Sequence, residues 1–134
     1  MENLKEIRWK QRFENFDKSY KLLKKYSHKP IVTELERAGI IQFFEMTFEL
    51  AWKTLKDYLE YLRISSNTGS PREVLKESYA HNLIENGEVW IKMMLARNSL
   101  SHLYDEEESR KIYEDIKNKY IFEIEKLVEF IEYK

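Results

Sequence analysis

The chain of 134 residues has the length of one domain, and 43% of its residues are apolar, enough to build a single core. Its 23 Lys and Arg against 24 Asp and Glu give a formal net charge of -1, which excludes a protein that holds nucleic acid by bulk positive charge alone. The chain has no cysteine, which excludes disulfide scaffolds, thiolate zinc sites and cysteine nucleophiles. Its 3 glycines and 2 prolines supply few turns, so we expect one domain over residues 1–134, built from a few long helices.

The sequence also bears on where the protein resides. No run approaches the roughly 18 apolar residues of a membrane-spanning helix. Residues 1–16 are charged throughout and lack the apolar stretch of a signal peptide. We therefore expect a soluble, cytoplasmic protein.

Two long helices are predicted in the first half of the chain. An apolar stripe at spacings of three and four predicts the first from about Asn3 to Tyr26, and Pro30 ends it. Nine Lys and Arg against four Asp and Glu in residues 1–30 indicate either a solvated face or a weak phosphate-attracting surface. The second helix, residues 33–63, has a broader apolar face typical of the central helix of a bundle, and Gly39 could mark a bend or a short break in it.

A third, short helix is predicted over residues 71–80, after the polar loop at residues 65–69. Ser70 can cap this helix and Pro71 suits its first position. Glu73, three residues after Ser70, can complete a capping box.

The remaining sequence predicts two more helices. A turn at Asn86-Gly87 precedes a short fourth helix that ends around Arg97 and Asn98. The acidic run from Asp105 to Glu108 suits the start of the last helix, where carboxylates complement the helix dipole. The elements together predict an all-α, up-and-down bundle of five helices, three long and two short.

The candidate site is the polar junction between the fourth and last helices. Arg97 offers a planar fork of donors that matches phosphate oxygens, and His102 suits proton transfer near neutral pH. Together they could cleave RNA without a metal. His102 would take a proton from a ribose 2′-hydroxyl or give one to the leaving 5′-oxygen, and Arg97 would stabilise charge on the phosphorane. Three further side chains could orient the phosphate or the imidazole: Asn98, Ser101 and Tyr104.

A purely structural interpretation of the junction competes with this one. An Arg and a His five positions apart often arise by chance, so their spacing alone is weakly specific. In the structural interpretation Arg97 pairs with Asp105 or Glu106, and His102 caps a helix end.

We expect no metal and no cofactor. The acidic run from Asp105 to Glu108 could bind a divalent cation, but helix capping explains these carboxylates more simply. His28 and His81 lie far in the sequence from any cluster of further ligand types, so we expect each to be a surface or helix-end residue and not a metal ligand. The chain has no glycine-rich phosphate loop.

Four sequence segments follow one another along the chain: Phe43–Tyr58, Ser70–Glu73, Ile84–Trp90 and Arg97–Asp105. In this order they resemble the prokaryotic HEPN family, in the branch described as nucleotidyltransferase substrate-binding proteins. The similarity extends roughly from Arg8 to Tyr133. The two segments that contain tryptophan, Phe43–Tyr58 and Ile84–Trp90, are more specific for the family than the pair of Arg97 and His102.

The resemblance implies an all-helical bundle that dimerises and a partner, a small minimal nucleotidyltransferase, encoded nearby. Many such pairs are toxin–antitoxin systems, in which the HEPN subunit is a ribonuclease. The nucleotidyltransferase silences it by adding AMP to the tyrosine of an R-x4-H-x-Y motif. Here that motif falls on Arg97, His102 and Tyr104.

Each site has only one Arg and one His. A two-fold homodimer would bring two such sites together in one cleft, supplying an acid, a base and two positive charges. AMP on Tyr104 would neutralise Arg97 and block the substrate. A heterotetramer with the nucleotidyltransferase is the other assembly we consider. Two alternative functions stay open: a non-catalytic subunit that presents substrate, or itself, to the nucleotidyltransferase, and a helical interaction protein without a role in nucleic-acid chemistry.

Overall fold

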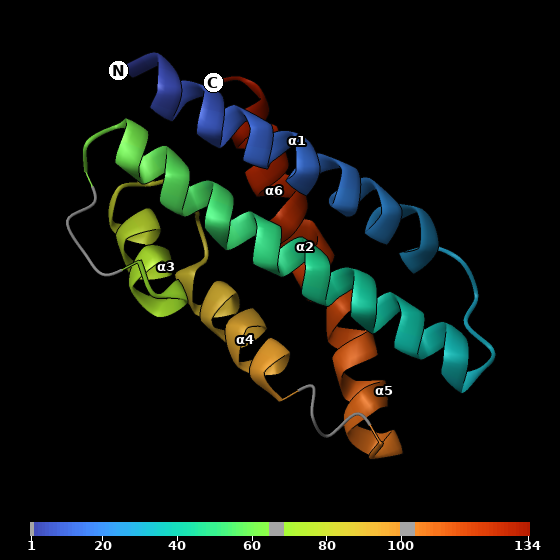
Figure 1. Ribbon diagram of the computed structural model, residues 1–134. Coiled ribbons are helices and arrows are strands. Elements are labelled where there is room, and N and C mark those ends of the chain that lie inside the picture. Colours follow the sequence, from blue (N-terminus) through green and yellow to red (C-terminus); the bar gives the residue numbers. More distant parts are fainter. Residues whose placement is uncertain (1, 65–68, 100–103) are drawn as a thin grey trace.

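A computed structural model describes residues 2–64, 69–99 and 104–134, which are helical with short connections and contain no strand (Figure 1). The elements in chain order are α1 (Glu2–Ser27), α2 (Glu34–Tyr61), α3 (Pro71–Ala80), α4 (Gly87–Asn98), α5 (Glu106–Asp115), the π-helical turn η2 (Ile116–Tyr120) and α6 (Ile121–Glu132). The α5, η2 and α6 segments follow one another without a loop, so the all-α bundle of five helices is confirmed. No helix in the described ranges is both long and apolar enough to cross a membrane.

Helix α2 is the centre of the bundle, as its broad apolar face predicted. It lies between α1 on one side and α3 and α4 on the other, while α6 passes behind it and α5 extends below it (Figure 1). The core around it contains large side chains without solvent exposure: Phe16, Phe44, Phe48, Leu55, Met93 and Ile124. Burying such side chains is the main favourable contribution to folding, so α2 is the central element against which the other helices pack.

A complete capping box fixes the start of α2. Thr33 Oγ1 accepts a hydrogen bond from the Glu36 backbone N–H at 3.1 Å, and Glu36 Oε1 accepts one from the Thr33 N–H at 2.9 Å. The short break considered at Gly39 does not occur, because α2 continues through it without interruption. One glycine costs a helix only about 1 kcal/mol, which the capping box and the packing of α2 offset.

The starts of the two short helices use side-chain caps. Ser70 Oγ accepts from the Glu73 N–H at 3.3 Å, and α3 has the predicted bounds. The turn predicted at Asn86-Gly87 is instead the start of α4: Asn86 is its N-cap and accepts from the Val89 N–H at 3.3 Å, and Gly87 is its first residue. The sequence signal was real but misassigned, since asparagine is favoured at N-caps as well as in turns.

The last helix contains a π turn that periodicity did not predict. Its cap bond runs from the Ile121 N–H to the Ile116 carbonyl, five residues back. The apolar stripe advances by four residues three times in succession, through Ile112, Ile116, Tyr120 and Ile124. In an ideal α-helix each such step drifts by about 40°. The wider π turn absorbs this drift, so all four side chains remain buried.

Candidate functional site

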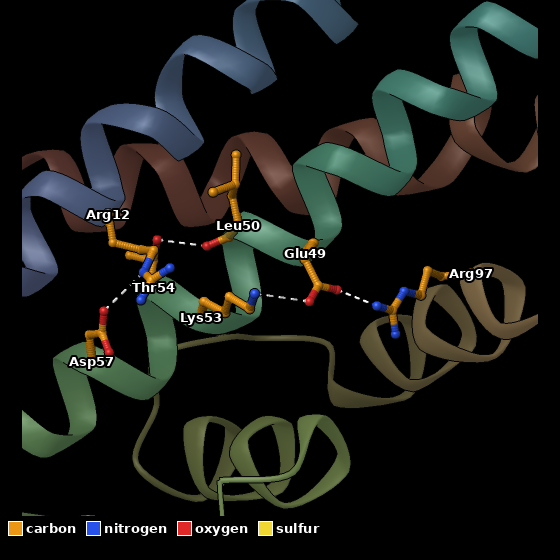
Figure 2. Close-up of polar contacts among 7 residues, drawn as sticks. All are labelled: Arg12, Glu49, Leu50, Lys53, Thr54, Asp57 and Arg97. Carbon is orange, nitrogen blue, oxygen red and sulfur yellow. Dashed lines mark hydrogen bonds and ion pairs between the residues drawn. The ribbon is translucent and has the colours of Figure 1, made fainter.

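The guanidinium of Arg97 is held by the central helix. Arg97 lies in the last turn of α4, and its Nη2 donates to Glu49 Oε2 of α2, 48 residues earlier (Figure 2). Each side chain is 29% exposed, so the ion pair is half-buried and solvent still reaches it. A positive charge in the last turn also interacts favourably with the carbonyl end of the helix dipole. Arg97 is therefore a fixed cation at the end of α4.

The Glu49 carboxylate bridges two cations. Its second oxygen, Oε1, lies 3.3 Å from Lys53 Nζ, one turn further along α2 (Figure 2). The formal charge of Glu49, Lys53 and Arg97 together is +1. The sequence did not identify Glu49 or Lys53 as site residues, because the segment around them was interpreted as a source of core side chains. Two polar residues four positions apart within an apolar phrase were the available signal.

The acidic residues suggested as alternative partners of Arg97 are engaged elsewhere. Asp105 Oδ1 accepts from two backbone N–H groups of the first turn of α5, at 3.0 and 3.2 Å, and so caps that helix. Glu106 Oε1 accepts from Arg110 Nη2 at 2.7 Å, and this hydrogen bond lowers the pKa of the Glu106 carboxyl. The structural interpretation therefore named the wrong partners for Arg97, although it was right that the guanidinium is paired.

Of the other predicted site residues in the junction, the structure describes Asn98 but not Ser101 or His102. Asn98 is exposed at the last position of α4, and the next residue, Ser99, donates from Oγ to the Ala96 carbonyl at 2.8 Å. Ser101 and His102 lie outside the described residues, so their predicted roles stay predictions. The described side chains bring Arg97 together with α2, not with Asn98.

Tyr104 stands at the start of the segment that leads into α5. It is 85% exposed and lines a hollow of about 400 Å³ together with Arg37 and Ser109. Arg37 Nε donates to the buried Ser109 Oγ at 2.9 Å, which ties the beginning of α2 to α5. The phenol is thus presented on a defined surface that another macromolecule can reach.

A groove of about 450 Å³ separates α4 from α5 and η2. Its lining includes Leu95, Ala96 and Ser99 on one side and Lys111, Ile112 and Lys119 on the other. It reaches the junction at Ser99, whereas the Arg97 side chain points toward α2 (Figure 2).

The described ranges contain no group of three or more His, Asp or Glu side chains arranged to hold a metal ion. His28 and His81 are exposed. The residues from Asp105 to Glu108 are also exposed, and Asp105 and Glu106 have the partners described above.

The chain belongs to the family described as "Nucleotidyltransferase substrate binding protein like", whose model matches residues 11–133. This confirms the resemblance to the nucleotidyltransferase substrate-binding branch of the HEPN family.

Two known proteins resemble the chain in particular. Over 89 residues it is 32% identical to a Haemophilus influenzae protein named "Probable ribonuclease HepT". The match covers 64% of this chain and 61% of that protein, so the chain spans about three fifths of its relative's length. A crystal structure of a Thermus thermophilus protein superposes with a TM-score of 0.73 at 25% identity, over 87% of this chain and 94% of the other.

Proposed function

We propose that this chain is the toxin subunit of a HEPN/nucleotidyltransferase toxin–antitoxin pair and acts as a metal-independent endoribonuclease. The observation that carries the proposal is Arg97, whose side chain is partly exposed and whose guanidinium is fixed at the end of α4, where the R-x4-H-x-Y motif begins. A buried or loosely placed arginine would serve this role less well, because phosphate recognition needs donors that are both accessible and oriented. The relative named as a probable ribonuclease adds support.

The proposed chemistry is transfer of an RNA phosphate to the neighbouring ribose. His102 removes the 2′-hydroxyl proton as the 2′-oxygen forms a bond to the adjacent phosphorus. The bond from phosphorus to the 5′-oxygen then breaks, and a second imidazole, from the partner copy in a homodimer, protonates the leaving oxygen. Arg97 stabilises the extra negative charge of the phosphorane between these events. Asn98 and Ser101 orient the phosphate or the imidazole.

Regulation would act through Tyr104. In the proposed step the Tyr104 Oη bonds to the α-phosphorus of ATP, pyrophosphate leaves, and the phenolic proton passes to solvent or a base of the nucleotidyltransferase. The exposure of this side chain suits access by a second enzyme. The resulting phosphodiester anion and nucleoside would neutralise Arg97 and obstruct RNA near His102.

The description of the matched family favours a second candidate, a non-catalytic subunit that presents a substrate or itself to the nucleotidyltransferase. Glu49 is consistent with it, because a paired arginine can be purely structural.

Expression of this chain alone separates the two candidates. If the chain is a ribonuclease, its expression should arrest growth, and Arg97→Ala or His102→Ala should relieve the arrest. Harmless expression of the soluble wild-type chain, with intact cellular RNA, would support the non-catalytic subunit instead.

A further inference from the structure

We infer that Glu49 is a positioning residue for the proposed ribonuclease, fixing the guanidinium of Arg97 for phosphate contact while Lys53 keeps the site cationic. This inference rests on the proposed function.

The first support is the position of each residue in its helix. Glu49 lies near the middle of the 28-residue helix α2, beside Phe48, Ala51 and Trp52, which are all buried. Arg97, in contrast, lies in the last turn of the 12-residue helix α4, where backbone carbonyls lack helical partners and helices fray. A carboxylate carried by the central helix thus fixes a long side chain that the end of its own helix would hold poorly.

The second support is the charge balance around Glu49. A carboxylate paired only with Arg97 would cancel the charge that attracts phosphate. The ammonium of Lys53, 3.3 Å from the other carboxylate oxygen, restores a formal charge of +1 to the cluster. Lys53 is also partly exposed, so it can face an incoming anion.

The third support is the set of hydrogen-bond donors that the Arg97 guanidinium keeps when it pairs with Glu49. It carries five N–H groups in a planar fork. Among the described residues, the contact with Glu49 engages Nη2, which leaves Nε and Nη1 as donors for phosphate oxygens. A guanidinium held by a carboxylate on one edge is oriented before the reaction begins, so less conformational freedom is lost in reaching the transition state.

The alternative is that the ion pair only joins α2 to α4. Removing Glu49 would then lower the melting temperature and leave the rate constant of the folded protein unchanged. A double-mutant cycle on the rate separates the two roles, because residues that act through one another give non-additive losses.

The experiment measures cleavage of an RNA oligonucleotide by the full chain under single-turnover conditions, at a temperature where every variant is folded. We expect Glu49→Ala to lower the rate constant at saturating RNA by about 10- to 100-fold, with little change in the RNA concentration for half-saturation. Glu49→Ala combined with Arg97→Ala should be no slower than Arg97→Ala alone. Glu49→Gln, which keeps an acceptor oxygen, should recover most of the lost rate.

The matched control is Glu125→Ala. Glu125 forms an interhelical ion pair with Lys24 at 3.3 Å, and its 30% exposure equals that of Glu49 within a percentage point, but it lies on α6. This variant should cleave RNA at the wild-type rate. The positioning role is wrong if Glu49→Ala also cleaves at the wild-type rate. It is equally wrong if the fold-loss in rate of the double variant is the product of the losses of Glu49→Ala and Arg97→Ala. In either case the proposed ribonuclease stands. A wild-type chain that cleaves no RNA overturns the proposed function and this inference with it.

Discussion

Arg12 of α1 donates from Nε to Asp57 Oδ2 of α2 at 3.1 Å, and the Asp57 side chain is only 6% exposed (Figure 2). Helix α2 therefore uses carboxylates to bind cations from two different neighbours, Arg12 from α1 and Arg97 from α4. The two pairs differ in environment, since the Asp57 side chain is buried and the Glu49 side chain is partly exposed. We assign a structural role to the first pair, and our proposal gives the second pair a functional role.

Removing the partner of the buried carboxylate should destabilise the fold. Arg12→Ala leaves the Asp57 charge buried without its ion pair, which costs more than an exposed pair contributes. Because the Arg12 side chain is itself 36% exposed, we expect a loss of about 1–3 kcal/mol in the free energy of unfolding. Urea denaturation measures it. Lys10→Ala, which removes an exposed pair with Glu6, is the control and should cost clearly less stability. Equal losses for the two variants would contradict this account of Asp57.

The capping box of α2 should contribute to the pH dependence of stability. Hydrogen bonds from the backbone N–H groups of Thr33 and Val32 hold the pKa of the Glu36 carboxyl below its usual value of 4.5. A lowered folded-state pKa means that this contribution is complete above about pH 4.5 and is lost as the pH falls through the folded value. Glu36→Gln keeps an acceptor without a titrating group.

We therefore expect Glu36→Gln to lose less stability than wild type between pH 7 and pH 3, as measured by denaturant unfolding at both values. Glu129→Gln, on the exposed surface of α6, removes the same charge and controls for net charge. If Glu36→Gln and Glu129→Gln show the same acid sensitivity, the capping box makes no specific contribution.

Tyr104 should be needed for silencing but not for cleavage. Co-expression of the chain with its nucleotidyltransferase should add one or more AMP masses, visible in the intact-protein mass spectrum. Tyr104→Phe should abolish this gain and cleave RNA even after co-expression, because the acceptor hydroxyl is gone while Arg97 keeps its contact with Glu49. Unchanged AMP addition to Tyr104→Phe would place the modification on another residue.

Local signals made most of the fold predictable. Ser70 and Pro71 mark the start of α3 by chemistry that acts within three residues, and the structure has α3 at the predicted bounds. Pro30 and Thr33 likewise confine the connection between α1 and α2 to a few residues. Asn86 shows the limit of such signals, because one side chain serves both turns and caps.

Long-range relationships were not predictable in the same way. That Arg97 is accessible and paired depends on which residue of α2 faces the end of α4, and a single sequence contains no signal for a contact across 48 residues. The π turn at η2 escaped prediction because a spacing of four residues is compatible with both α-helical and π-helical geometry over one turn. The candidate motif could thus be located from sequence, but its anchoring by Glu49 could not.

The most direct test of the central claim is cleavage of RNA by the purified chain in the presence of a metal chelator. The account predicts cleavage by the wild-type protein, and losses of about 100-fold or more in folded Arg97→Ala and His102→Ala. Tyr104→Phe should remain active as the control. Wild-type RNA cleavage that persists unchanged in both Arg97→Ala and His102→Ala would contradict the account, because the activity would then belong to another site or to a contaminant.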